Sequence, residues 1–207
     1  LGLGDALNKG DGAGEMGDNL SIVDLGTGRT AVRVAAGANH TVVILDDGSV
    51  KAWGNNTYGQ LGQGHTNNIG DGAGEMGDNL SAVDLGTGRT AVAIAAGDNH
   101  TAVILDDGTI KVWGQNAFGQ LGQGNTIQLG DDSGEMGSNL STVNLGTGRT
   151  AVYLAAGGGN TAVILDDGTV KVWGKNTFGQ LGQGHINSIG DDSNEMGDNL
   201  LAVNLGT

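Results

Sequence analysis

The sequence has no cysteine, no proline and few basic or aromatic residues, and each shortage narrows the possible functions. Without cysteine, disulfide bonds and thiolate metal sites are excluded. Its 207 residues include nine lysines and arginines against 23 aspartates and glutamates, which gives a formal net charge of -14. Because nucleic acids and acidic membranes are held by clustered positive charge, we expect neither as a partner. No apolar run approaches the roughly 18 residues of a membrane-spanning helix.

Glycine, by contrast, is abundant, and its 42 copies keep fixed places in a repeat. Trp53, Trp113 and Trp173 lie 60 residues apart, and the residues around them are nearly the same each time. A constant period of this length is typical of tandem supersecondary units. We therefore divide the chain into units 1–60, 61–120 and 121–180, followed by a spare linker and outer strand at 181–207.

Each unit predicts four short β-strands. In the first unit these are residues 21–25, 30–36, 41–45 and 50–53. Asp46-Asp47-Gly48 has the composition of a tight hairpin turn between the last two. The Gly-rich acidic segment before the first strand cannot form a helix interior and predicts an ordered loop. The fold class is therefore all-β, with four-stranded antiparallel sheets that stack in tandem, as propeller blades rather than as a solenoid.

The best-defined stretch of the unit runs from Ala35 to Gly64. It reads Ala-Ala-Gly-x-x-His-Thr, then Leu-Asp-Asp-Gly-x-x-Lys-x-Trp-Gly-x-Asn-x-x-Gly-Gln-Leu-Gly-x-Gly. This pattern resembles the repeat of the regulator of chromosome condensation family, and the resemblance implies a β-propeller, commonly of seven blades. The added Gly-Glu-Met-Gly and Gly-Thr-Gly-Arg segments resemble the longer form found in bacterial cell-surface proteins. Two departures are a missing proline before the outer strand and Asn160 in place of the histidine.

The two ends of the chain are in the same phase of the repeat. There are three Trp-Gly cores but four acidic linkers. Three blades are fewer than the roughly four to eight that close a propeller. We therefore expect either an incomplete propeller cut from a longer array, or copies that complete one another, the spare strand pairing with an exposed edge of a neighbour.

The acidic linker is the first candidate site. Its carboxylates stand among flexible glycines and would suit calcium, which takes six to eight oxygen ligands. The residues are Asp11, Glu15, Asp18, Asp71, Glu75, Asp78, Asp131, Glu135, Asp191, Glu195 and Asp198. The alternative is that these carboxylates pair with Arg29, Arg89 and Arg149 or accept hydrogen bonds from loop amides. No other cofactor is expected.

His40 and His100 share one phase, and paired imidazoles can bind zinc or act as bases. Asn160 takes that place in the third unit and is a poor zinc ligand, so we favour a structural role in which the side chain ties a turn to the backbone. The three tryptophans recur identically, which favours packing between blades over a carbohydrate platform. Because every candidate acid recurs with the repeat, whereas an active site is normally singular, we predict no enzyme activity.

Differences among the units mark a second candidate site, for a protein partner. They concentrate in the loop that follows Gly-Gln-Leu-Gly-x-Gly, and equivalent loops of stacked units emerge on one side. The residues are His65, Asn67, Asn68, Asn125, Gln128, His185 and Asn187. Drift on an exposed loop would produce the same variation.

We therefore expect a non-enzymatic scaffold, extracellular or on a cell surface, that serves structure, adhesion or protein binding and associates with itself or with another surface protein. The resemblance also admits nucleotide exchange on a small GTPase with chromatin attachment, which the acidic charge opposes, and an inhibitor or recognition module. A lyase or hydrolase on the propeller has only analogy of fold in its favour.

Overall fold

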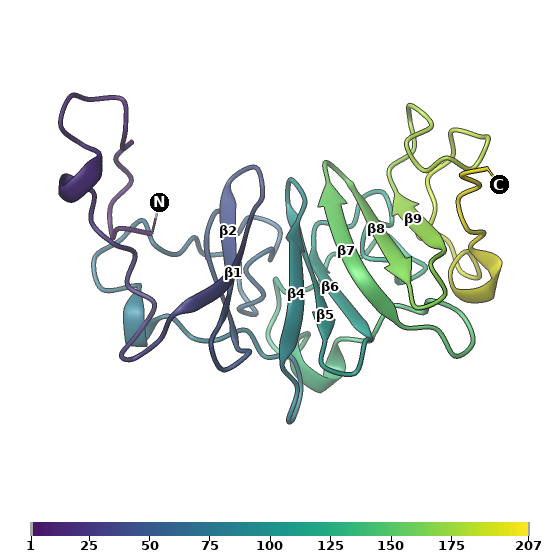
Figure 1. Cartoon of the computed structure of the whole chain (residues 1–207), viewed down its shortest axis with the longest axis horizontal. Coiled ribbons are helices and arrows are strands. Elements are labelled where there is room, and N and C mark those ends of the chain that lie inside the picture. Colours follow the sequence, from purple (N-terminus) through teal and green to yellow (C-terminus); the bar gives the residue numbers. More distant parts are fainter. Residues whose placement is uncertain (1, 207) are drawn as a thin grey trace.

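The computed structural model describes residues 2–206, which form nine β-strands in three antiparallel sheets (Figure 1). Each sheet comes from one unit, and its strands pair in chain order. The strands are β1 (Ala31–Ala36), β2 (His40–Leu45), β3 (Val50–Gly54), β4 (Ala91–Ala96), β5 (His100–Leu105), β6 (Ile110–Gly114), β7 (Ala151–Gly157), β8 (Asn160–Leu165) and β9 (Val170–Gly174). The acidic linkers contain the one-turn 3-10 helices η1 (Gly17–Asn19), η2 (Gly77–Asn79), η3 (Gly137–Asn139) and η4 (Gly197–Asn199). None of the helices described is long or apolar enough to cross a membrane.

The Asp-Asp-Gly turn sets the register of each sheet. Gly48 has a φ of 79°, a conformation that glycine adopts without steric cost, and its N–H donates to the Leu45 carbonyl over 2.9 Å. The Asp47 carboxylate accepts hydrogen bonds from the Ser49 amide, over 3.0 Å, and from its hydroxyl, over 2.6 Å. β2 and β3 then pair from Ile44 with Val50 to His40 with Gly54, as the predicted hairpin requires.

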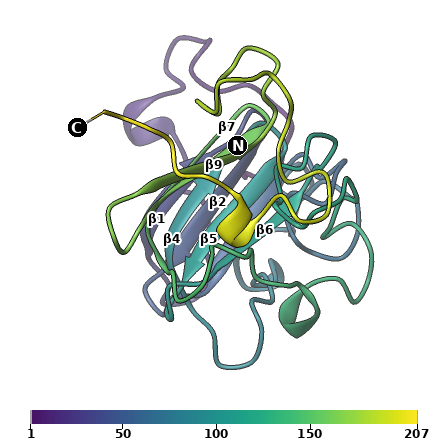
Figure 2. The ribbon, with the colours of Figure 1, turned by 90° about the vertical axis from the view of Figure 1, so that its right-hand side faces the viewer.

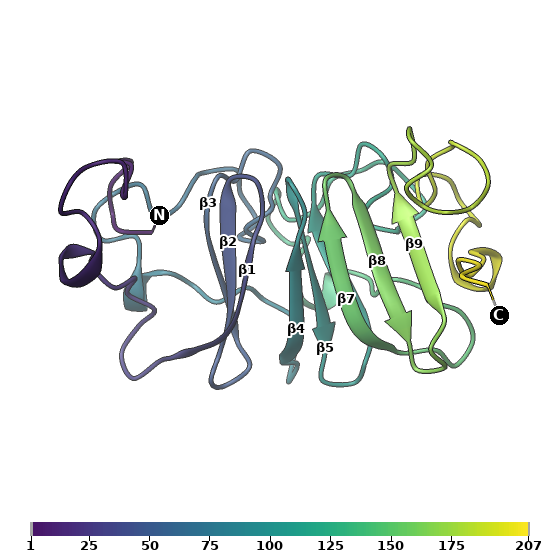
Figure 3. The ribbon, with the colours of Figure 1, turned by 45° about the horizontal axis from the view of Figure 1, so that its top comes forward.

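The sheets converge at their first strands and diverge at their third strands. β1 contacts β4 and β4 contacts β7, whereas the third strands do not pack closely on one another. The first sheet is seen nearly edge-on and the third more nearly face-on, so the sheets rotate along the array (Figure 3). A wedge of this kind is the geometry of propeller blades around an axis on the side of the first strands.

Apolar side chains fill the spaces between sheets. Between the first two sheets, Val42 and Ile44 of β2 are buried in one cluster with Val103, Leu105 and Trp113 of the second unit. The same arrangement recurs one unit later around Trp173. Each of these cores draws on successive units and on the linker that follows them, such as Leu140 in the first and Met196 and Leu200 in the second.

The predicted outer strand differs in the structure. Residues 21–25 are extended but belong to no strand, so the sheets have three strands and not four. The equivalent segment of each later linker lies along the third strand of the preceding sheet with one backbone hydrogen bond. Val83 donates to Val50 over 2.8 Å, Val143 to Ile110 over 2.9 Å and Val203 to Val170 over 2.8 Å. One such bond per segment does not extend the ladder, and the segment instead fills the wedge where the sheets diverge.

The structure also shows which linker copy lacks a sheet to lie on. We expected residues 181–207 to be spare, but in the structure Leu181 and Leu200 are buried and Val203 is bonded to β9. The first copy has no preceding sheet among residues 2–206, and its Met16 is 57% exposed, whereas the equivalent Met196 is 9% exposed. The repeat pattern does not tell these two copies apart, because they are in the same phase and their apolar anchors, such as Met16 and Met196, are the same.

Candidate functional site

The buried histidines join one sheet to the next. The imidazole Nε2 of His40 lies 3.0 Å from the Thr101 hydroxyl of the following unit, and His100 lies 3.0 Å from Thr161 in the same way. The Thr101 hydroxyl donates to the Gln60 carbonyl over 2.8 Å. It must therefore accept from His40, which places the proton of this neutral imidazole on Nε2. The predicted structural role is confirmed, but the contact is with a side chain of the next unit and not with a turn.

Burial fixes the charge of these histidines. It lowers the pKa of His40 and of His100 to about 4, so both are neutral at pH 7. Their Nδ1 atoms are buried without a hydrogen-bond partner among the described residues. A Cβ at Gly37 would collide with the His40 ring, and one at Gly97 with the His100 ring. Asn160 makes no equivalent contact in the described part of the chain.

The tryptophans complete the same junctions. Trp113 Nε1 donates to the Gln60 carbonyl and Trp173 Nε1 to the Gln120 carbonyl, each over 3.0 Å. Both indoles are fully buried. A fully buried indole offers no face to a sugar, so packing between blades is their role.

Three buried lysines were not singled out by our sequence interpretation. Lys51, Lys111 and Lys171 project from the third strands, and each ammonium donates to carbonyls of two successive linkers. For Lys51 these are Leu25, at 2.9 Å, and Gly77, at 2.8 Å. Burial lowers the pKa of Lys111 and of Lys171. The signal was available, because a lysine that recurs every 60 residues within an apolar strand is under a structural constraint.

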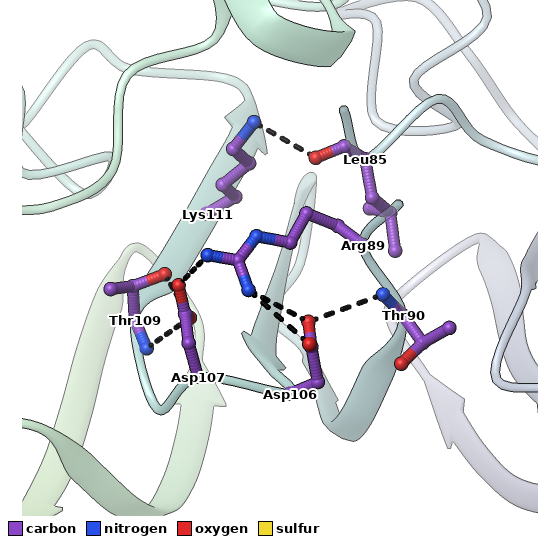
Figure 4. Close-up of polar contacts among 7 residues, drawn as sticks. All are labelled: Leu85, Arg89, Thr90, Asp106, Asp107, Thr109 and Lys111. Atoms are coloured by element: carbon purple, nitrogen blue, oxygen red, sulfur yellow. Dashed lines mark hydrogen bonds and ion pairs between the residues drawn. The ribbon is translucent and has the colours of Figure 1, made fainter. Parts of the chain in front are cut away.

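The arginines pair with the hairpin turns and not with the acidic linkers. Figure 4 shows Arg89 between Asp106, which lies 3.2 Å from Nη1, and Asp107, which contacts Nη2. Arg29 and Arg149 make equivalent pairs with their own turns. In the same view Lys111 reaches the Leu85 carbonyl, on the linker that leads to Arg89. The predicted alternative of arginine pairing in the linker is therefore wrong.

The linker glutamates accept hydrogen bonds from amides of their own loops. Glu15 accepts from Gly12, at 2.8 Å, and from Gly10, at 2.9 Å, and these bonds lower its pKa. Glu75, Glu135 and Glu195 each accept two equivalent bonds. This is the amide-capping role that we weighed against calcium.

The linker aspartates are dispersed. Asp78 accepts from the Thr27 hydroxyl over 2.6 Å and Asp198 from that of Thr147 over 2.6 Å, and both have lowered pKa values because of these bonds. Asp11, Asp18 and Asp71 are exposed, Asp131 contacts the Gln128 amide, and burial raises the pKa of Asp191. No three acidic or histidine side chains within residues 2–206 come close enough to hold a metal. Calcium binding thus stays a prediction that the geometry does not support.

The variable loops, residues 65–68, 125–128 and 185–188, are held by the same asparagine in each unit, and we call these asparagines the constant frame. Asn56 Nδ2 donates to the His65 carbonyl over 2.6 Å, Asn116 to that of Asn125 over 2.8 Å, and Asn176 to that of His185 over 2.8 Å. These anchors bind backbone atoms, so the side chains of the loops are free to differ. Asn67, Asn68, His185 and Asn187 are exposed, whereas His65, Asn125 and Gln128 are half-buried.

A concave apolar strip runs along the first strands, on the side where the sheets converge. Val32 and Val34 of β1, Val92 of β4, and Val152 and Tyr153 of β7 are between 48% and 69% exposed. They line a hollow of about 720 Å³. In a closed propeller this surface would face the central axis.

Comparison with known proteins matches the repeated frame. Two models of the "Regulator of chromosome condensation (RCC1) repeat" match, one at residues 31–60, 91–120 and 151–180 and the other at 47–104, which together exceed half of the chain. The chain is 34% identical over 152 residues to the X-linked retinitis pigmentosa GTPase regulator homolog of Caenorhabditis elegans, covering 72% of this chain and 10% of that protein. It is 25% identical over 193 residues to human E3 ubiquitin-protein ligase HERC2, covering 92% and 4%.

Among solved structures, the chain is similar to yeast RCC1 (Prp20) as bound to Kap60. The TM-score is 0.57 at 19% identity, over 77% of this chain and 36% of that one. This likeness shows the fold. The chain spans a small part of each of these proteins.

Proposed function

Since this chain belongs to the regulator of chromosome condensation (RCC1) repeat family, we propose that it is a non-enzymatic scaffold that binds protein partners through its variable loops. The observation that carries the proposal is the constant frame beneath these loops. Asn56, Asn116 and Asn176 hold loop backbones in the same way, while the side chains that they present differ from unit to unit. A rigid frame with variable loops is the arrangement by which repeat scaffolds distinguish partners.

The buried histidines are inaccessible to a substrate, and this supports a binding role over a catalytic one. His40 beside Thr101 has the composition of a base and a hydroxyl nucleophile. Both side chains are buried, and the Thr101 hydroxyl already donates to the Gln60 carbonyl. No substrate can reach this pair without separating two sheets. We propose an extracellular or cell-surface location together with the binding role, because the Gly-Glu-Met-Gly and Gly-Thr-Gly-Arg segments resemble the longer form found in bacterial cell-surface proteins; the acidic, cysteine-free composition is compatible with it.

A variant in which the three loops have the same sequence, while the asparagines that hold them are kept, tests this proposal. Residues 125–128 and 185–188 are replaced by the sequence of residues 65–68, so that the three loops become identical. Because the anchors mainly bind backbone carbonyls, the variant should melt like the wild type. The immobilised wild type should capture one or a few proteins of the source organism that the variant loses. A variant with Asp11→Asn and Asp71→Asn is the control and should retain them. Equal capture by wild type and loop variant would refute the proposal.

A second candidate function is guanine nucleotide exchange on a small GTPase. It is favoured by the 34% identity to a protein named as a GTPase regulator homolog. The net charge of -14 opposes the chromatin attachment that would accompany it. Release of fluorescent GDP from a panel of small GTPases tests this candidate. Acceleration of about tenfold or more by the chain, lost in the loop variant, would favour exchange over a passive scaffold.

A further inference from the structure

We infer that the hollow between the last two acidic linkers, residues 130–145 and 190–205, binds a neutral saccharide. The last linker faces the viewer in Figure 2, where η4 is the yellow one-turn helix. The hollow has a volume of about 540 Å³, within the roughly 300–1,000 Å³ of small-molecule sites. We call it the amide hollow, because side-chain amides dominate its lining. It is separate from the variable loops.

The lining of the amide hollow is polar and almost uncharged. Asp198 is the one ionisable side chain among the described residues that line it, and its oxygens already accept hydrogen bonds from Thr147, over 2.9 Å from the amide and 2.6 Å from the hydroxyl. The other polar side chains are four amides and two hydroxyls, of Gln123, Asn144, Asn194, Asn199, Thr142 and Ser193.

This lining selects the chemical class of the ligand. An anion would find no cation among the described lining residues, and a cation would find one carboxylate that already accepts two hydrogen bonds. An apolar ligand would leave the amides without water or a partner, which is unfavourable. An amide offers a donor and an acceptor together, and so does a hydroxyl, so a ring of sugar hydroxyls satisfies such a lining.

Several of these amides have atoms to spare. Asn144 Oδ1 accepts from the Gly146 amide over 3.0 Å, while its Nδ2 has no hydrogen-bond partner within residues 2–206. The Asn194 carbonyl accepts from Asn199 Nδ2 over 2.8 Å, but no described residue bonds to the Asn194 side chain. Gln123 Nε2 donates to the Ser141 carbonyl over 3.1 Å. Two amides are therefore fixed by the backbone and two others are open to a ligand.

The backbone at Asn194 is the second observation. Its φ is 69°, and it is the one non-glycine residue with a positive φ in the described part of the chain. The equivalent Gly14, Gly74 and Gly134 have φ values of 80°, 78° and 88°. Glycine takes this conformation without steric cost, whereas asparagine takes it at some cost. The chain thus places an amide side chain where the turn itself requires only glycine, which points to a use for that side chain.

The equivalent hollows of the other linkers are less polar. The one between the first two linkers has a volume of about 330 Å³ and is lined by Leu3, Ile22 and Ala73, where the amide hollow has an amide and two hydroxyls. In the middle pair of linkers, Asp84 and Gly134 stand at the places of the two open asparagines. The full set of amides therefore occurs once, as a ligand site requires.

The amide hollow does not owe its openness to the end of the chain. Ala82, Asp84, Gly134 and Asn139 hold the equivalent places in the middle pair of linkers. All four are exposed, although the third sheet and the last linker follow them. A following unit thus leaves these positions open to solvent.

Titration of the ¹⁵N-labelled full chain with maltose, cellobiose, lactose and diacetylchitobiose, up to about 50 mM, tests the inference through the side-chain amide NMR signals. No aromatic side chain is among the described residues that line the hollow, so binding rests mainly on hydrogen bonds and on Met196, which is 9% exposed at its floor. At least one sugar should shift the signals of Asn144 and Asn194, with a Kd of about 0.1–10 mM.

Two variants remove the open amides one at a time. Asn194→Gly and Asn144→Asp should each weaken binding about three- to tenfold, because each removes one hydrogen-bonding group. Both restore the residue that the other units have at that place, so both should melt close to the wild type. Asn67→Gly is the matched control, since it removes an exposed amide from a variable loop of the array, and it should bind the sugar like the wild type.

A gain of binding completes the test. Ala82→Thr, Asp84→Asn and Gly134→Asn together copy the lining into the middle pair of linkers, where a Cβ at Gly134 would meet no described atom within 4 Å. This variant should bind two sugars per chain. An array of immobilised neutral glycans separates the two sources of the ligand, because the end of a longer glycan binds in both formats and a free saccharide binds only in solution.

Two results would overturn the inference. The first is that none of the four sugars shifts the amide signals of Asn144 and Asn194. The second is that Asn194→Gly and Asn67→Gly bind the sugar equally well.

Discussion

The second and third sheets have almost the same sequence but different surroundings. β5 and β8 both contain Thr-Ala-Val-Ile-Leu, and in both the isoleucine pairs with the first residue of the next strand. Ile104 is 2% exposed because the third sheet covers it, whereas Ile164 is 36% exposed. The burial of a residue in this fold is thus set by the neighbouring unit as much as by its own strand. The stability of the array should accordingly reside in its junctions.

The largest expected effect compares these two isoleucines directly. Ile104→Ala should lower the free energy of unfolding by about 2–5 kcal/mol, because it leaves a cavity in a core shared by two sheets. Ile164→Ala should cost about 1 kcal/mol, since part of that side chain is already in water. Urea denaturation followed by tryptophan fluorescence measures both. Equal losses of unfolding free energy would show that each sheet is stabilised mainly by its own contacts and that the covering unit adds little.

The part of the fold that depends on one unit could be predicted from the sequence. The hairpin around Asp46-Asp47-Gly48 was predicted correctly, because turn chemistry and alternating apolar residues are local signals. The strand expected at residues 41–45 is β2, which begins one residue earlier. The repeat also identified the family.

The part that depends on two units could not be predicted. Residues 21–25 have the pattern of a strand but form none, and their equivalents at 81–85 lie in the wedge between the first two sheets, where Val83 donates to the Val50 carbonyl of the preceding unit. His40 meets Thr101, 61 residues later, and no local pattern indicates that contact. These two misses share one cause, which is that the relevant partner lies in another unit. Glu15 is a different case, because its two donors, Gly10 and Gly12, lie in its own loop, and amide capping was the alternative that the sequence offered to calcium.

The second prediction uses pH to compare the junctions that contain histidine with the third sheet, which does not. Burial lowers the pKa of His40 and of His100 to about 4, whereas an unfolded histidine titrates near 6.5. Below pH 6.5 the unfolded chain binds protons that the folded chain does not. The free energy of unfolding therefore has its full value above pH 6.5 with respect to these histidines. It falls by about 3 kcal/mol for each histidine as the pH falls toward 4.

His100→Asn should remove one of these two contributions and flatten the profile of unfolding free energy between pH 7 and pH 4. Asn160→His is the matched control. It adds an imidazole at the equivalent place on the third sheet, where burial is less, and it should leave the profile nearly unchanged. If Asn160→His made the profile as steep as one more buried histidine would, the place of Asn160 on the third sheet would exclude water as well as the junctions between sheets do.

The smallest expected effect concerns the arginine–aspartate pairs, which the second and third sheets have in common. Arg89 and Arg149 are 35% and 38% exposed at the side chain and pair with the hairpin turns of the second and third sheets. Because such pairs are solvated, Arg89→Ala should cost only about 0.2–1 kcal/mol, and less at high salt. Arg149→Ala should change the urea midpoint no more than Arg89→Ala, since neither pair depends on a neighbouring sheet. Arg89→Lys, which keeps the charge, should recover part of the loss. If Arg89→Ala were much more damaging than Arg149→Ala, the hairpin turns would also be coupled across the junction, where Gly108 already accepts the Ala151 amide. The hairpin turn, which is predicted from one unit alone, would then also depend on contacts with the next unit.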